Sequence, residues 1–213
     1  MATKAQVNAV VTIKEPNIQT AEIEIQSVSP LVQNKFSAKA KAKMMATMAA
    51  GSTAKGKKER EPRDYDDDFL HAQHISEDGW RGLPAPAFRS AMISACRLVG
   101  FQMTKAKLSI FVRHDGIDRE DGTPLVKLIA GEPERHEALV RMNGGMSTDI
   151  RIRPMWRQWG AKVMVSWDAD QFTLSDVLNL MDRAGQQVGI GEGRPDSKTS
   201  TGMGWGQFRV VRG

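Results

Sequence analysis

The chain has 213 residues, of which 40% are hydrophobic, and Cys96 is its single cysteine. This length and composition predict one elaborated domain with a substantial core. One cysteine excludes an internal disulfide and a cysteine-rich zinc site. The sequence lacks an apolar run long enough to cross a bilayer and the apolar stretch of a secretory signal, so we expect a cytoplasmic protein without a membrane partner.

The net charge of +5 is concentrated in residues 35–63, which hold nine lysines and arginines against two glutamates. The remaining residues there are mostly small or polar and supply too little apolar surface to offset the entropy of ordering the chain. We predict a mobile basic loop that reaches a phosphate backbone. A solvated charge run without function is the alternative. The candidate contacts are Lys39, Lys41, Lys43, Lys55, Lys57 and Lys58.

The first half of the chain contains two predicted strands and one predicted helix. Residues 20–28 alternate polar and apolar side chains, which predicts a half-buried strand. Residues 87–99 carry an apolar stripe at helical spacing after two prolines and before a glycine, which predicts a helix. Cys96 lies on that stripe, so we interpret it as a core residue and not a nucleophile. Residues 107–112 alternate again and predict a strand.

The second half repeats this order after an insertion. Residues 113–153 are polar and glycine-rich, and we interpret them as an inserted arm or hairpin. A strand is predicted over 161–167, and Thr173 with Asp176 resembles the capping box of a helix that Gly185 ends. The last predicted strand is 206–211. This order predicts an α+β, ferredoxin-like (RRM-like) βαββαβ core from residues 20–34, 80–112 and 160–211, with the basic loop inserted after the first core strand.

A glycine-rich loop precedes the last predicted strand. Six glycines between residues 188 and 206 permit backbone angles and close approaches that side chains would block. The loop follows a helix and enters a strand, which is the reverse of a dinucleotide-binding loop. Residues 51–58 nearly match a phosphate-binding P-loop, but Lys58 stands where a magnesium-binding Ser or Thr is needed. The sequence therefore predicts neither nucleotide hydrolysis nor a cofactor.

Three motifs in this order resemble the RAMP superfamily of CRISPR-associated proteins. They are Ser29-Pro30-Leu31 at the end of a strand, Gly82-Leu83-Pro84 before a helix with Phe88-Arg89-Ser90-Ala91, and the end of the glycine-rich loop from Gly202 to Phe208. The chain is similar to a backbone-type subunit or to a stand-alone, phage-encoded relative. The resemblance implies a ferredoxin-like fold that binds RNA, assembly along a guide RNA, and CRISPR-type protein partners.

The resemblance also implies which residues contact the RNA backbone. In that family the glycine-rich loop and the inserted arms make these contacts. On this sequence the implied residues are Arg89, Gly191, Gly193, Arg194, Lys198, Gly202 and Gly204. Trp205 in the same loop is a further candidate, which either stacks on a base or packs against the protein.

A further candidate lies in residues 150–159, where arginines alternate with two tryptophans. Arginines pair with phosphates, and exposed indoles stack on unpaired bases. The candidate residues are Arg151, Arg153, Trp156 and Arg157. The equally weighted alternative is that Trp156 and Trp159 pack the insertion onto the sheet.

No catalytic or metal site is predicted. The four histidines are His71, His74, His114 and His136, and an isolated histidine is more often structural than catalytic. The acidic run at Asp64, Asp66, Asp67 and Asp68 lacks the glycine and closing glutamate of a calcium loop.

The sequence thus predicts a non-catalytic protein that binds RNA or single-stranded DNA by its backbone and forms a homo-oligomer or filament. Two alternatives stay open: a metal-independent endoribonuclease of the same fold that uses His71 or His114, and a viral protein-interaction module that mimics a CRISPR subunit. The sequence does not distinguish RNA from single-stranded DNA, because neither a 2′-hydroxyl contact nor a base-reading pocket is visible in it.

Overall fold

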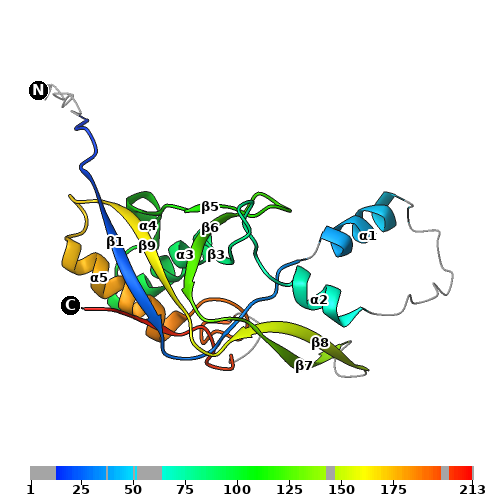
Figure 1. Ribbon diagram of the computed structural model, residues 1–213. Coiled ribbons are helices and arrows are strands. Elements are labelled where there is room, and N and C mark those ends of the chain that lie inside the picture. The colour runs from blue at the N-terminus through cyan, green and yellow to red at the C-terminus, as the bar shows by residue number, and fades with distance from the viewer. Residues whose placement is uncertain are drawn as a thin grey trace, which may run out of the picture.

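The computed structural model describes residues 13–36, 38–49, 51, 64–142, 147–197 and 202–212. It is an α+β protein built on one large antiparallel sheet and one small one, which confirms the predicted class (Figure 1). In the large sheet the strand order is β10-β1-β9-β6-β3, with β4 also paired to β9 and β5 to β6. Its strands are β1 (Ile18–Ser27), β3 (Gly82–Pro84), β4 (Ile110–Val112), β5 (Gly116–Ile117), β6 (Pro124–Ala130), β9 (Gly160–Asp168) and β10 (Phe208–Val210).

Strand β1 lies between β10 and β9 in this sheet and is half-buried as predicted. It pairs with β9 from Ile18 opposite Asp168 to Gln26 opposite Gly160. Ile23 and Ile25 are buried in the core, whereas the glutamates between and before them are exposed. Alternating side chains point to opposite faces of a strand, so one face of the sheet is covered and the other meets solvent.

Helices pack on the covered face (Figure 1). Helix α3 fills the predicted position, and the fully buried Cys96 follows it, which confirms that residue as part of the core. Thr173 and Asp176 form the predicted capping box at the start of α5. These helical elements are α3 (Ala85–Ala95), η1 (Cys96–Val99), α4 (Met103–Ser109), α5 (Leu174–Arg183) and the π-turn η3 (Ala184–Val188).

Two predicted boundaries are wrong. Gly185 does not end a helix, because η3 continues through it to Val188. A Cβ at Gly185 would lie 2.2 Å from the Phe208 carbonyl oxygen, so glycine is needed there for the close approach of β10. The predicted strand over 107–112 is helical up to Ser109, because Ala106 and Ser109 are both buried and three residues apart. Three residues is close to one helical turn, not an alternating spacing.

The predicted arm at 113–153 divides between the two sheets. Strand β6 joins the large sheet because Leu125 and Val126 are buried in it, so this part of the arm prediction is wrong. The hairpin of β7 (Glu134–Met142) and β8 (Ser147–Trp156) extends from the body and forms the small sheet with β2 (Leu31–Val32) (Figure 1).

The basic segment is not a loop over its described part. Helix α1 (Ala38–Ala49) begins shortly after β2, and α2 (Tyr65–His71) follows; both lie at the end of the molecule away from α5 (Figure 1). Alanine, lysine and methionine are strong helix formers, so α1 forms without a large apolar face. Residues 52–63 lie outside the described part of the chain. None of the helices in the described ranges is long and apolar enough to span a bilayer.

Candidate nucleic-acid interface

The glycine-rich loop folds back on the segment that follows β1. The backbone N–H of Gly206 donates to the Pro30 carbonyl at 2.7 Å, and that of Glu192 donates to the Val32 carbonyl at 2.9 Å. Inside the loop, the N–H of Met203 donates to the Gly193 carbonyl at 2.7 Å. Main-chain hydrogen bonds therefore fix the shape of this loop wherever the structure describes it.

Glycine is required where the loop meets its neighbours. Gly206 has a positive φ of 69°, and a Cβ there would lie 1.7 Å from the Ile190 carbonyl oxygen. Gly204 also has a positive φ, 73°, but a Cβ there would meet nothing closer than 3.9 Å. A side chain would disrupt the packing at Gly206, whereas at Gly204 it would meet only backbone strain. The two positions form a matched pair for experiment.

A groove separates this loop from helix α3. One hollow of about 480 Å³ is lined by residues of the loop and of other segments, among them Gln33, Asn34, His74, Gly191, Gly193 and Arg194. A second hollow of about 670 Å³ continues along α3 past Arg97 and Lys107. The two hollows share Ala87, Gly191 and Arg194, so they adjoin. We call the whole the α3–loop groove.

The free charges of the groove are positive. Arg97 pairs with Asp196 at 2.6 Å, and Glu192 pairs with Arg153 at 2.8 Å, so both loop carboxylates are already neutralised. The Arg194 guanidinium donates to the Gly191 carbonyl at 3.2 Å and makes no ion pair among the described residues. A guanidinium held in this way keeps further donors for a phosphate.

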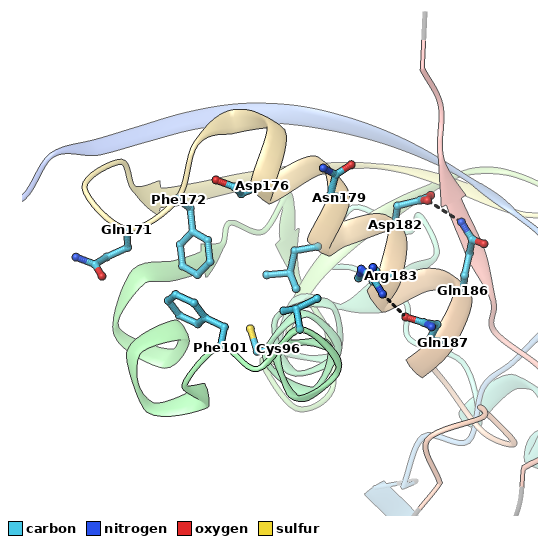
Figure 2. A pocket seen from close by; sticks show the side chains of 12 residues that line it. Cys96, Phe101, Gln171, Phe172, Asp176, Asn179, Asp182, Arg183, Gln186 and Gln187 are labelled. Carbon is cyan, nitrogen blue, oxygen red and sulfur yellow. Dashed lines mark hydrogen bonds between the residues drawn. The ribbon is translucent and has the colours of Figure 1, made fainter.

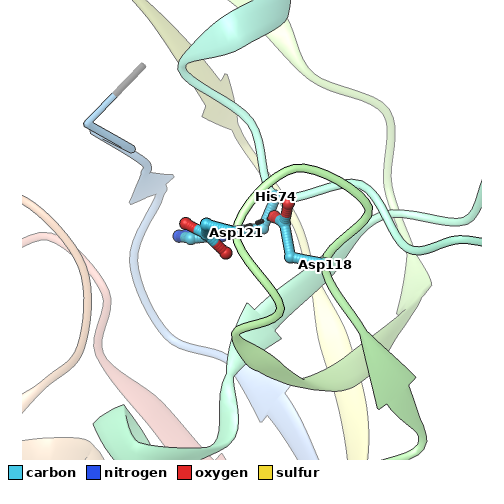
Figure 3. A group of neighbouring side chains, drawn as sticks. All are labelled: His74, Asp118 and Asp121. Atoms are coloured by element: carbon cyan, nitrogen blue, oxygen red, sulfur yellow. Dashed lines mark hydrogen bonds and ion pairs between the residues drawn. The ribbon is translucent and has the colours of Figure 1, made fainter. Parts of the chain in front are cut away.

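Beside the groove lies a buried polar cluster that sequence reasoning missed. The Lys35 ammonium contacts Asp118 at 2.6 Å and Glu120 at 3.0 Å. His74 Nδ1 lies 2.9 Å from the second oxygen of Asp118 (Figure 3), and His71 Nδ1 lies 2.8 Å from Glu120. We call these five residues the Lys35 cluster. Lys35 and Asp118 are 83 positions apart, so no local pattern joins them.

The charges of the cluster stabilise one another. Burial alone would lower the pKa of Lys35, but hydrogen bonds and attraction from Asp118 and Glu120 outweigh it and raise that pKa. Burial would likewise raise the pKa of Asp118 and Glu120, yet Lys35 holds both below their ordinary values. For His74, burial is the largest influence and lowers the pKa, so the ring is neutral near pH 7.

Three potential metal ligands meet at this cluster. Ligand atoms of His74, Asp118 and Asp121 lie within 4.8 Å of one another (Figure 3). The Lys35 ammonium already neutralises Asp118, and a cation there would have to displace it. This grouping therefore gives no reason to assign a metal site.

Two residues of the arginine and tryptophan segment, Trp156 and Arg153, have structural roles. Trp156 is fully buried, so the prediction that it stacks on a base is wrong, and the alternative of packing is correct. Arg153 is 8% exposed and braces the glycine-rich loop through Glu192. Arg157 is exposed and pairs with Glu134, and Arg151 lies 3.5 Å from Asp149; both lie on or next to β8, outside the groove.

The remaining candidates differ in their surroundings. Arg89 donates to the carbonyls of Ile110 and Lys107 and does not line the groove, so it ties α3 to β4. Trp205 is half-buried and contacts the His136 ring edge-on at 5.3 Å. Lys41 and Lys43 are exposed on α1. Outside the described residues or side chains lie Lys39, Lys55, Lys57, Lys58 and Lys198, while Gly191, Gly193, Gly202 and Gly204 belong to the described loop.

A larger hollow lies between the α3–η1 segment and α5 but suits a phosphate poorly. Its volume is about 740 Å³, and Phe101, Phe172 and Cys96 form its apolar floor (Figure 2). Asp176 and Asp182 stand at its edge with Arg183 as its single cation. Two carboxylates repel a polyanion, so the α3–loop groove is the better candidate.

No family model matches the sequence, and no curated protein is significantly similar to it.

Proposed function

We propose that the protein binds RNA by its phosphate backbone in the α3–loop groove, as a non-catalytic nucleic-acid-binding protein. One observation carries the proposal: the glycine-rich loop is held by main-chain bonds beside α3, with Arg194 in the groove unpaired by any described carboxylate. Backbone amides and guanidinium donors are the groups that hold phosphates without reading sequence.

The order of the elements supports a ferredoxin-like core for this protein. The chain runs β1, α3, β4, β9, α5, β10, and in the sheet β10 lies beside β1, while β9 lies between β1 and β4. All of these pairs are antiparallel. A βαββαβ fold would have this order of elements, which supports the proposed core and the proposed kinship to RAMP proteins.

The test compares two arginines that differ in position but carry the same charge. Arg194→Ala removes a groove cation, and Arg183→Ala removes an exposed arginine on α5 outside the groove. Affinity for fluorescent single-stranded RNA is measured against salt concentration. Loss of one backbone contact should weaken binding and reduce the slope of log K against log salt by about 0.7 for Arg194→Ala alone. Equal effects of both variants would contradict the groove assignment.

A second test concerns the shape of the loop. Gly206→Ala forces a clash with Ile190, whereas Gly204→Ala adds a Cβ in open space at a similar φ. Both pay the strain of a positive φ, roughly 1 kcal/mol. If the loop holds RNA, Gly206→Ala should lose far more affinity for RNA than Gly204→Ala. Circular dichroism checks that both variants are folded. Equal affinities would show that the loop shape does not matter for binding.

We also propose that copies of the chain assemble along RNA, as a backbone subunit of the RAMP type would. Size-exclusion chromatography with light scattering on RNAs of increasing length distinguishes the outcomes. Mass that rises in equal steps with RNA length supports assembly, whereas a fixed ratio of one protein to one RNA overturns it.

Metal-independent RNA cleavage is the second candidate, because the neutral His74 ring is oriented by Asp118 beside the groove. A general base needs such a ring near its substrate. Labelled RNA incubated in chelator separates the candidates: intact RNA supports the non-catalytic proposal, and cleavage that His74→Ala abolishes supports the enzyme.

A further inference from the structure

His74 lies between the Lys35 cluster and the α3–loop groove. Its side chain is 13% exposed, and the residue lines the same hollow of the groove as Arg194. Its Nδ1 atom lies 2.9 Å from Asp118, whose side chain is fully buried (Figure 3). Its backbone N–H donates to the Gln33 side chain, which in turn donates to the Gly82 carbonyl at 2.7 Å. Both the ring and the backbone of His74 are thus fixed.

The contacts of Asp118 determine which nitrogen of His74 carries the proton. Lys35 contacts one Asp118 oxygen at 2.6 Å, and the N–H of Glu120 donates to the same oxygen, so the carboxylate is ionised and only accepts hydrogen bonds. The Nδ1 atom must therefore be the donor to Asp118. Burial lowers the pKa of His74 and keeps the ring neutral, which leaves Nε2 without a proton.

A hydrogen-bond acceptor is unexpected in a site for phosphate. The Arg194 guanidinium offers donors, whereas an unprotonated Nε2 offers a lone pair that a phosphate oxygen would repel. The acceptor requires an O–H or N–H on the ligand. In a backbone bound without base reading, the ribose 2′-hydroxyl is the group that supplies this donor next to each phosphate, and DNA lacks it.

We infer that His74 Nε2 accepts a hydrogen bond from a ribose 2′-hydroxyl in the α3–loop groove and thereby makes the protein select RNA over single-stranded DNA. The inference rests on the proposed function, because it presumes that the groove holds a nucleic-acid backbone. The Lys35 cluster then has a functional role as well as a structural one: Lys35 keeps Asp118 ionised, and Asp118 keeps Nε2 an acceptor.

The experiment compares three oligouridines of one length that differ only at the 2′ position: ribose, 2′-fluoro and deoxy. The 2′-fluoro sugar keeps the pucker of RNA but has no proton to donate. Wild-type protein should bind the ribose form roughly five- to ten-fold more tightly than the 2′-fluoro form, the loss expected for one hydrogen bond. Binding is measured in chelator by fluorescence anisotropy, with gel analysis of the recovered RNA.

Two variants test the residue. His74→Ala and His74→Phe both remove the acceptor, and the second keeps an aromatic ring in place. Each should bind ribose and 2′-fluoro oligouridine equally, with the 2′-fluoro affinity unchanged from wild type. His114→Ala, at an exposed position, is the matched control and should keep the full preference. Thermal melting of each variant shows whether it is folded.

pH gives an independent readout on unmodified protein. Protonation of His74 converts Nε2 from an acceptor into a donor, so the preference for ribose over 2′-fluoro should hold at pH 7 and disappear in acid, below the ordinary histidine pKa of about 6.5. Asp118, Asp121 and Lys35 are the charged groups that act on the ring. The carboxylates attract the proton, and Lys35 opposes it.

The failures of the two proposals are distinguishable. Equal affinity of the wild type for ribose and 2′-fluoro forms, with salt-dependent binding of both, overturns the role of His74 and leaves backbone binding intact. A ribose preference that survives in both His74 variants also overturns it. Absence of binding to all three oligouridines overturns the proposed function and this inference together.

Discussion

Lys35 and the lysines of α1 come from the same basic stretch but have opposite environments. The Lys35 side chain is 3% exposed and contacts two carboxylates, whereas Lys41 and Lys43 project into solvent from α1. The sequence around them is similar in composition. The difference teaches that charge density in a sequence does not distinguish a lysine that holds the fold together from a lysine that is free to meet a polyanion.

The reason for the difference lies in the partners. Lys35 follows β2, which is fixed against β8, and its N–H donates to the Ala72 carbonyl. Its side chain is thereby directed at Asp118 and Glu120, in the turn after β5. The described side chains of α1 are all exposed, so none of them fixes that helix in the same way. Four predictions test this comparison, from the largest expected effect to the smallest.

Replacing Lys35 should cost the most stability. Lys35→Met leaves the fully buried Asp118 carboxylate without its cation, and breaking a buried ion pair in this way costs about 3–5 kcal/mol. Lys41→Met is the matched control and should change the free energy of unfolding by less than about 0.5 kcal/mol. Urea denaturation followed by circular dichroism measures both. Similar losses in the two variants would contradict the comparison.

Gln33 should show a smaller effect of the same kind. Its buried amide links the Gly82 carbonyl to the His74 N–H, and Gln33→Ala leaves both backbone groups without that partner. The expected cost is about 1–3 kcal/mol. Asn34→Ala, at the neighbouring exposed position, serves as the control and should be close to neutral. A neutral Gln33→Ala would mean that water replaces the amide.

Acid should weaken the cluster and leave α1 unaffected. Because the pKa values of Asp118 and Glu120 are lowered in the folded protein, their stabilisation is present above the unfolded values near pH 4 and is lost as the pH falls through the folded ones. The lowered pKa of His74 adds a loss that begins below about pH 6.5, because the unfolded ring binds its proton first.

Urea denaturation across this pH range should therefore show stability falling steadily with acid. In Lys35→Met the carboxylates lose the cation that lowers their pKa values, so the acid dependence below pH 5 should be shallower than in wild type. A steeper dependence in that variant would contradict the assigned cause.

The α1 lysines should affect binding and not folding. Lys41→Ala with Lys43→Ala should weaken binding to single-stranded RNA and reduce the salt slope by up to about 1.4, or 0.7 for each lost contact. The melting temperature should not change. Unchanged affinity and slope would support the alternative that this run is a solvated face without function.

Some structural features of this protein follow from the local sequence. The alternation that produces β1, the prolines and Gly100 around α3, and the Thr173–Asp176 capping box all act between neighbours, so the sequence predicts them. The glycine-rich loop was likewise recognisable as a place of close backbone approach. What it approaches was not, because Gly206 and Pro30 meet only in the folded chain.

Other features depend on packing. The burial of Trp156 decided between two equally weighted interpretations, base stacking and packing, and α4 replaced half of a predicted strand because Ala106 and Ser109 are both buried. Single-sequence patterns do not report which of two faces is covered, and here the covered face decided each case.

The sequence by itself determined the α+β class, the first core strand, the two core helices and a glycine-rich loop, because propensity, periodicity and capping act over a few residues. The tertiary structure alone decided that Lys35, Asp118 and His74 meet beside that loop. Their partnership joins segments far apart in the chain. The bridge between Ser76 and Asp118 and the hydrogen bond from the Lys35 N–H to the Ala72 carbonyl bring these segments together in the folded chain.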